Sequence, residues 1–161
     1  MVVYVDSWLL RGITAMKPGT RTVTMREFTK LRNPSYTAVI PQIALGETIS
    51  TMMRDMADDA NAFNTVTKKL FDSIANILDV SKCMPPPSPE SFEIAHDLKH
   101  CDGSLDITDL LIVSQALADP DSQLLLTADG KLVHSMAIKC KDAELYGCDK
   151  RRSGLRLADR L

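Results

Sequence analysis

The amino-acid sequence predicts an α/β domain with a mostly parallel central sheet. Short apolar runs typical of buried strands, at 2–5, 37–41 and 123–127, alternate with longer segments of helical periodicity. Helical connections between consecutive strands favour parallel pairing. The 161 residues are enough for one domain with a sizeable core, and a composition of 45% hydrophobic and 25% charged residues is ordinary for a globular protein.

In the first half of the chain, the elements follow from local signals. Asp6 or Ser7 is a suitable residue to start a helix directly after the apolar VVYV run. Proline ends the TAVIP run, and two amphipathic segments then follow one another. We therefore expect a strand at 2–5, a helix that begins at Asp6 or Ser7, a turn at 17–20, a helix at 24–32, a strand at 37–41, and helices at 42–56 and 58–78.

In the second half, a proline run in the segment 83–91 predicts a loop. The elements expected after it are helices at 91–100 and 107–119, a turn at 119–122, a strand at 123–127, a helix at 130–138, an edge strand at 140–147 and an amphipathic C-terminal helix at 152–161. We expect one domain over residues 1–148, with the basic tail 149–161 helical and packed on it.

Charge is distributed unevenly although the net charge is only −2. Residues 1–32 and 130–161 are basic, whereas residues 33–129 hold five Lys and Arg against fifteen Asp and Glu. Basic flanks can steer a polyanion, while an acidic middle repels phosphate unless a cation is bound there. A solvated surface is the more common explanation for scattered charge.

The sequence gives no sign of a membrane protein or of a disulfide scaffold. No apolar run approaches membrane-spanning length, and the N-terminal MVVYV lacks a basic leader, so we expect a cytoplasmic protein without a membrane partner. The four cysteines form no C-x-x-C pair, which favours reduced structural thiols. His96, His100 and Cys101 could approach zinc from one helix, but no fourth ligand is evident, so a zinc site is disfavoured.

Two aspartates are predicted to lie at the carboxyl ends of strands, where ligand sites form in α/β sheets. Asp6 follows the first strand directly, and Asp129 comes two residues after the strand at 123–127. Each also has a structural explanation, because Asp6 could cap the next helix and Asp129 could form a turn with Gly130.

Asp106 and Asp109 precede a strongly apolar helical segment, in DGSLDITDLLIVSQALAD. Asp109 lies near the centre of the apolar face, where a carboxylate is costly unless it is paired or metal-bound. A helix cap explains one of the two acids but explains both poorly. Glu47 lies opposite an apolar stripe, so it is a solvated residue, a partner for Arg54, or a residue that faces a cleft above the sheet.

Three other site classes fit less well. A calcium loop aligned on DGSLDITD would have Leu98 and His100 at its first ligand positions, where oxygen ligands are needed. A haloacid-dehalogenase type of phosphohydrolase needs a second Asp two residues after the first, where this chain has Trp8. A phosphoacceptor receiver domain needs an acidic pair after its first strand, and VVYVDS offers one acid.

The four acids, in the order Asp6, Glu47, Asp109 and Asp129, resemble those of the PIN-domain ribonuclease family. VVYVDS resembles the opening strand of the family, and AVIPQIALGE resembles its second strand with the proline and the glutamate-bearing helix that follow. ITDLLIVSQAL resembles the helix that begins with the third acid, and LLLTAD resembles the fourth strand. The order and approximate spacing agree over residues 2–138. The proline run and the basic tail depart from the family pattern.

The resemblance implies a three-layer α/β/α domain with a mostly parallel sheet of four to five strands, often dimeric. It implies a Mg²⁺- or Mn²⁺-dependent endoribonuclease that hydrolyses RNA by metal-activated water, and it extends to toxins with an antitoxin partner. A PIN-like scaffold that binds RNA or protein without cutting is the alternative. The metal-binding and catalytic acids that the resemblance implies are Asp6, Glu47, Asp109 and Asp129. The auxiliary residues are Ser7, Asp106 and Thr127. The RNA-binding candidates, chosen for their proximity to the acids in sequence, are Arg11, Lys17, Arg21 and Lys131.

Hard-cation chemistry is consistent with this set of residues. Carboxylates without Cys or His select cations such as magnesium or manganese. Such a cation would also reverse the local repulsion between an acidic pocket and the phosphate backbone.

Overall fold

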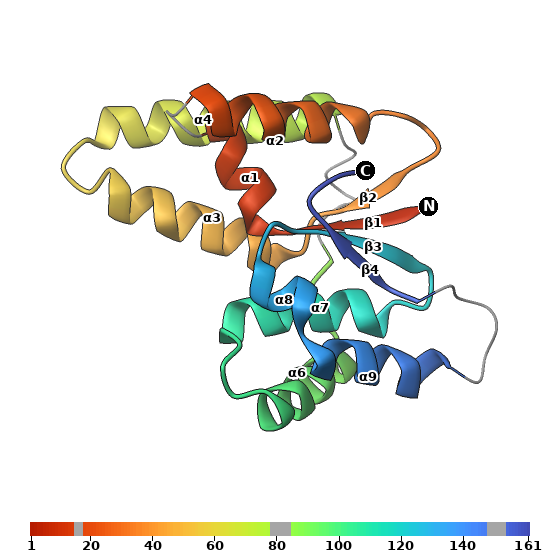
Figure 1. Ribbon diagram of the computed structural model, residues 1–161. Helices are drawn as coiled ribbons and strands as arrows, with labels where there is room; N and C mark the ends of the chain where they lie inside the picture. The colour runs from red at the N-terminus through yellow and green to blue at the C-terminus, as the bar shows by residue number, and fades with distance from the viewer. Residues whose placement is uncertain (15–17, 78–84, 148–153) are drawn as a thin grey trace.

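The computed structural model confirms the predicted fold class: in the part of the chain that it describes, helices flank one four-stranded parallel sheet (Figure 1). It describes residues 1–14, 18–77, 85–147 and 154–161. The strand order is β2-β1-β3-β4, so the first strand lies inside the sheet. The strands are β1 (Val2–Val5), β2 (Thr37–Val39), β3 (Ser122–Leu126) and β4 (Arg156–Ala158).

The central strands are apolar because helices cover both faces of the sheet. Val3, Val5 and Leu124 to Leu126 have no exposed surface. The parallel register aligns Val5 with Leu126, and the N–H of Asp6 continues the ladder by donating to the carbonyl of Leu126 at 3.2 Å. The residues that follow β1 and β3 therefore lie next to each other at the carboxyl edge of the sheet.

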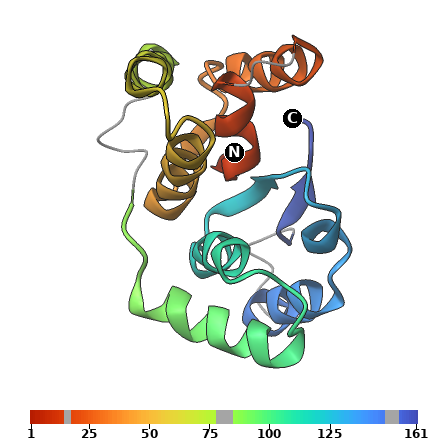
Figure 2. The same ribbon diagram turned by 90° about the vertical axis from the view of Figure 1, so that its left-hand side faces the viewer.

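The first four helices form the layer on one side of the sheet (Figure 1). Helices α3 and α4 form a hairpin that extends beyond the sheet, and the view in Figure 2 shows them beside α1 and α2. The base of α3 also contacts α7, which belongs to the other layer. The bounds are α1 (Ser7–Thr14), α2 (Pro18–Lys30), α3 (Gln42–Asp55) and α4 (Ala60–Ile77).

The later helices form the layer on the opposite side (Figures 1 and 2). Helix α7 packs against both β3 and α6, and its residues Leu110, Ile112, Val113, Ala116 and Leu117 are fully buried. The bounds are α6 (Pro89–Cys101), α7 (Ile107–Ala118), α8 (Gly130–His134) and α9 (Met136–Tyr146). The three layers match the architecture expected from the sequence.

Several predicted elements were wrong in detail. The edge strand predicted at 140–147 is helical in α9, and its Lys, Ala, Glu and Leu residues have high helix propensity. The helix predicted at 130–138 is divided at Ser135 into α8 and α9. The turn predicted at 17–20 is wrong at Pro18–Thr20, where α2 begins, while Lys17 lies outside the described residues.

The C-terminal helix predicted at 152–161 is also wrong. Residues 156–158 form β4, which pairs in parallel with β3, and residues 152–153 lie outside the described residues. The conformation of this strand comes from its pairing with β3. Among the described residues, no helix is both long enough and apolar enough to cross a membrane.

Candidate metal centre

Asp6 directly follows β1 at the carboxyl edge of the sheet, and only 3% of its surface is exposed. Its Oδ1 accepts a hydrogen bond from the Ser7 N–H at 2.6 Å, and its Oδ2 accepts one from the Thr127 hydroxyl at 2.7 Å. Burial raises the pKa of the Asp6 carboxyl above its ordinary value, although these two hydrogen bonds oppose the shift. Thr127 thus contacts Asp6 through its side-chain hydroxyl, whereas Ser7 does so through its backbone N–H.

Thr127 connects Asp6 with Asp129. Its hydroxyl donates to Asp6 and accepts a hydrogen bond from the N–H of Asp129 at 3.1 Å. Asp129 is the N-cap of α8, where its Oδ1 accepts a hydrogen bond from the Lys131 N–H at 2.7 Å. Asp129 therefore caps a helix, in place of the turn with Gly130 that the sequence offered as its structural explanation.

Glu47 reaches the site from α3. Its Oε1 lies 3.9 Å from the Arg11 guanidinium of α1, and its Oε2 is buried without a hydrogen-bond partner among the described residues. An unsatisfied buried carboxylate oxygen carries a desolvation cost. The sequence left several interpretations of Glu47 open, and the structure agrees with the one in which Glu47 faces a cleft.

Asp109 lies in the first turn of α7, one turn after Asp106. Asp106 is the N-cap of this helix, because its Oδ1 accepts a hydrogen bond from the Thr108 N–H at 2.9 Å. Asp109 is left half-buried, with its carboxylate near Asp6, which follows β1, and near Glu47 of α3. The cap therefore accounts for Asp106 and leaves Asp109 without a structural explanation.

Three acids from different elements converge. Single carboxylate oxygens of Asp6, Glu47 and Asp109 all lie within 4.8 Å of one another. Burial, followed by repulsion from Asp6, Asp129, Glu47 and Asp106, raises the pKa of Asp109 to about 7. Such a cluster is unfavourable when fully ionised, and a bound cation would relieve the repulsion.

Two hollows open beside the acidic cluster. One has a volume of about 560 Å³ and is lined by Arg11 and the polar face of α3, including Glu47 and Arg54. The other, of about 430 Å³, is lined by Lys99, Lys131 and the loop before α7. Asp106, Asp109 and Asp129 line both hollows. The two hollows therefore adjoin at these three acids.

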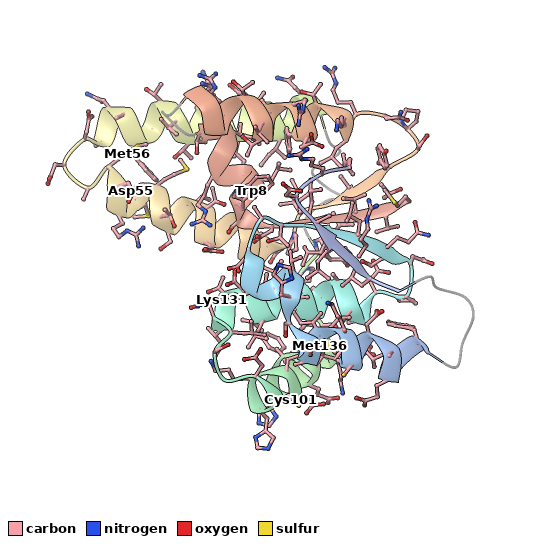
Figure 3. All side chains as sticks on the ribbon, in the orientation of Figure 1. Trp8, Asp55, Met56, Cys101, Lys131 and Met136 are labelled. Carbon is pink, nitrogen blue, oxygen red and sulfur yellow. The ribbon has the colours of Figure 1, made fainter. Side chains whose placement is uncertain are left out.

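The predicted RNA-binding residues have different positions. Arg11 lines the first hollow, and Lys131 lines the second, projecting from α8 (Figure 3). Arg21 lies on α2 and lines neither hollow. Lys17 lies outside the described residues. Of the three described candidates, Arg11 and Lys131 thus lie beside the acids, and Arg21 does not.

Several lining residues were not selected from the sequence as functional. Ser50, Thr51 and Arg54 line the first hollow, and Lys99 and Ser104 line the second. Ser50, Thr51 and Arg54 share the polar face of α3 with Glu47, and that common face was the available signal. Lys99 and Ser104 gave no comparable signal, because their positions depend on how α6 packs against α7.

The cluster fits a hard divalent cation. All three candidate ligands are carboxylates, the donor type that Mg²⁺ and Mn²⁺ prefer, and one oxygen of Glu47 has no hydrogen-bond partner in the part of the chain that the structure describes. Among the described residues, no second group of at least three His, Cys, Asp or Glu side chains has such a geometry. His96, His100 and Cys101 therefore do not form a compact metal site there.

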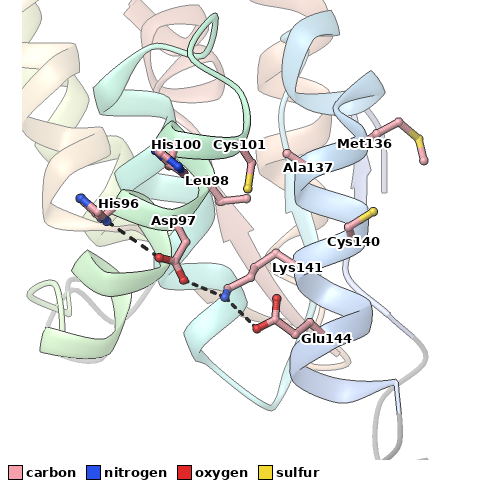
Figure 4. Close-up of a pocket in the computed structure, with 10 residues that line it drawn as sticks. All are labelled: His96, Asp97, Leu98, His100, Cys101, Met136, Ala137, Cys140, Lys141 and Glu144. Atoms are coloured by element: carbon pink, nitrogen blue, oxygen red, sulfur yellow. Dashed lines mark hydrogen bonds and ion pairs between the residues drawn. The ribbon is translucent and has the colours of Figure 1, made fainter.

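His96, His100 and Cys101 line a different pocket of about 590 Å³, between α6 and α9 (Figure 4). An ion-pair network bridges this pocket. Lys141 of α9 contacts Asp97 of α6 at 2.9 Å and Glu144 at 3.1 Å. These contacts raise the pKa of Lys141 and tie the two helices together.

The comparisons with known proteins agree with this architecture. The chain is similar to one in the crystal structure of VapBC2 from Rickettsia felis bound to a DNA fragment from their promoter (TM-score 0.63, 16% identity, covering 85% of this chain and 95% of that one). It is also similar to a chain in the crystal structure of FitAcB from Neisseria gonorrhoeae (TM-score 0.61, 14% identity, covering 87% and 93%). No protein-family model and no curated protein matches the sequence. At these identities the similarity concerns the fold, which is PIN-like.

Proposed function

We propose that this protein is a Mg²⁺- or Mn²⁺-dependent endoribonuclease that hydrolyses phosphodiester bonds of RNA. The convergence of Asp6, Glu47 and Asp109 within 4.8 Å, at the carboxyl edge of a parallel sheet, is the observation that carries the proposal. When bound, the cation would supply an activated water and stabilise the charge of the leaving oxygen. No nucleophilic side chain is required for this chemistry.

The protein's own groups have separate tasks in this proposal. Asp6, Glu47 and Asp109 hold the cation, and Asp129 is the fourth acid at the border of both hollows. Ser7 and Thr127 fix the Asp6 carboxylate through two short hydrogen bonds, so that it is oriented before the cation binds. Arg11 and Lys131 supply positive charge on either side for the phosphates of the substrate.

The fold comparisons support a more specific role. Toxin–antitoxin complexes contain the chains to which this fold is similar, and those chains are matched over nearly their whole length. We therefore propose that the nuclease acts as a toxin and is held by an antitoxin protein, with homodimerisation as in the PIN resemblance.

Cleavage of RNA with Mn²⁺ or Mg²⁺ tests the proposed activity. Asp6→Asn and Asp109→Asn should each reduce the rate by about a hundredfold or more, because each neutralises a carboxylate of the cation site. Asp121→Asn is the matched control, since Asp121 is exposed and precedes β3 at the opposite edge of the sheet. Its rate should equal that of the unmodified protein.

Metal-dependent cutting that survives both substitutions in the acidic cluster would exclude this site. A folded protein that neither cuts RNA nor binds Mn²⁺ would instead favour the non-catalytic PIN-like scaffold. Chelation by EDTA separates metal-dependent cleavage from contaminating metal-independent ribonucleases.

A further inference from the structure

We propose that Arg11 exchanges partners in the proposed reaction: it is the counter-ion of Glu47 in the metal-free protein and contacts an RNA phosphate once the cation is bound. The inference rests on the proposed function and deepens it. It makes Arg11 a substrate-binding residue that couples loading of the cation to binding of the substrate.

The existing contact between Arg11 and Glu47 is weak enough to be exchanged. The guanidinium nitrogen and Oε1 are 3.9 Å apart, beyond hydrogen-bond distance, and 44% of the Arg11 side chain is exposed. The Glu47 side chain is 26% exposed, so solvent reaches both partners, and ion pairs that solvent screens contribute little to stability. Because Arg11 projects from α1 and Glu47 from α3, breaking their contact disturbs no hydrogen bond within either helix.

A cation held by the acidic cluster would change the electrostatics around Arg11. In the metal-free protein, the negative charges of Glu47 and its neighbours attract the guanidinium. A divalent ion among the same carboxylates would neutralise that attraction and repel Arg11. The charge of Arg11 would then be free to act on another anion.

The first hollow offers such an anion a place beside Arg11. It has a volume of about 560 Å³, and Ser50 and Thr51 contribute polar side chains to its wall. A guanidinium binds phosphate oxygens in pairs, which suits a backbone phosphate next to the one being cleaved. The long side chain of Arg11 can turn towards it without movement of α1.

Arg54 provides the matched control. It lines the same hollow and carries the same charge, but its guanidinium lies 3.4 Å from Asp55, outside the acidic cluster. Removal of its charge therefore changes the hollow without removing a counter-ion from Glu47. Arg11→Gln and Arg54→Gln keep polar side chains at exposed positions, so both should fold.

The first measurement is the affinity for Mn²⁺ alone, by electron paramagnetic resonance or calorimetry. Arg11→Gln should bind Mn²⁺ about three- to tenfold more tightly, because a competing positive charge is removed. Arg54→Gln should bind within about twofold of the unmodified protein, since solvent and salt screen its more distant charge. Equal affinities of Arg11→Gln and the unmodified protein would overturn the inference.

The second measurement is RNA cleavage at saturating Mn²⁺. Arg11→Gln should raise KM about tenfold, with a smaller effect on kcat, and should lower the slope of log KM against log salt by about one. Arg11→Lys should recover part of the KM, since it restores the charge without the paired donors. An unchanged KM in Arg11→Gln would show that Arg11 does not contact the substrate.

The outcomes separate this inference from the proposed function. An unmodified protein that binds no Mn²⁺ or cuts no RNA would overturn both. An unmodified protein that does both, beside an Arg11→Gln variant with unchanged Mn²⁺ affinity, would overturn the exchange of partners alone.

Discussion

At the residue scale, Asp109 has the most perturbed environment among the described acids of the cluster. Burial and four neighbouring carboxyl groups raise its pKa to about 7, against an ordinary value of 3.8. Between these two pH values the folded protein holds a proton on Asp109 that the unfolded chain has released. The free energy of unfolding of the metal-free protein should therefore fall as the pH rises through this range.

Asp109→Asn should remove this penalty. In EDTA at pH 8, the variant should be more stable than the unmodified protein by about 1–2 kcal/mol, which corresponds to a Tm about 3–6 °C higher. At pH 5 the difference should be small, because Asp109 is then neutral in the folded protein. Thermal unfolding followed by circular dichroism at both pH values measures the effect.

Mn²⁺ should reverse the order of thermal stability of the unmodified protein and Asp109→Asn. At pH 8, Mn²⁺ should raise the Tm of the unmodified protein by ligand linkage and have little effect on Asp109→Asn. A metal-free variant that is less stable than the unmodified protein at pH 8 would contradict the electrostatic explanation of Asp109.

At the element scale, the sequence predicted those parts whose signal is local. The apolar runs of β1, β2 and β3 and the periodicity of α3, α4 and α7 have clear patterns, and all are present. β4 has three residues, and its pairing with β3 over a long stretch of chain determines its conformation. No local pattern could therefore have distinguished it from the amphipathic helix that we expected.

The candidate site was predictable to a similar extent. Asp6 and Asp129 follow buried strands, so their position at the sheet edge followed from topology. Glu47 was selected through the family resemblance alone, because its place on the polar face of α3 is equally typical of a solvated residue. Its contact with Arg11 depends on how α1 packs against α3, which one-dimensional periodicity does not contain.

A buried acid outside the site also acts between elements. Glu27 of α2 has no exposed surface and accepts hydrogen bonds from Lys30 and Arg26, and from the N–H of Leu161 beyond β4. Burial raises the pKa of Glu27, but the bonds from Lys30, Leu161 and Arg26 outweigh it and the pKa is lowered. This carboxylate therefore stabilises the fold above the pH at which an ordinary glutamate ionises, and the contribution is lost as the pH falls further.

Glu27→Gln should lower the free energy of unfolding at pH 7 by about 1–3 kcal/mol, because an amide cannot replace a carboxylate between two cations. The difference from the unmodified protein should shrink in acid, where Glu27 itself becomes protonated. Urea unfolding at pH 7 and pH 3.5 measures both effects. Glu93→Gln is the control, since Glu93 is exposed on α6, and its stability should stay within about 0.5 kcal/mol. An equal loss in the two variants would remove the special role of Glu27.

At the scale of the whole molecule, the sheet connects the chain's last strand with the acids. The carbonyl of Ala158 accepts a hydrogen bond from the Thr127 N–H at 2.9 Å, directly beyond the paired residues of β3 and β4. The hydroxyl of the same Thr127 holds Asp6. The backbone position of Thr127, and with it the orientation of Asp6, therefore depends on a strand about thirty residues further along the chain.

Deletion of residues 155–161 should for this reason affect the site as well as the fold. It removes β4 and the acceptor for Thr127, and it also removes the Leu161 contact of Glu27. We expect a lower Tm and, in the fraction that remains folded, an affinity for Mn²⁺ about tenfold weaker, the scale typical of lost support for a metal ligand.

Leu157→Ala separates the two effects, because it removes half-buried apolar surface from β4 but keeps the backbone pairing. Leu157→Ala should lower the Tm and leave the Mn²⁺ affinity within about twofold, since hydrophobic burial and the backbone bond to Thr127 are independent contributions. If the deletion variant folds and binds Mn²⁺ as tightly as the full chain, Asp6 is oriented without β4 and the coupling through Thr127 is absent.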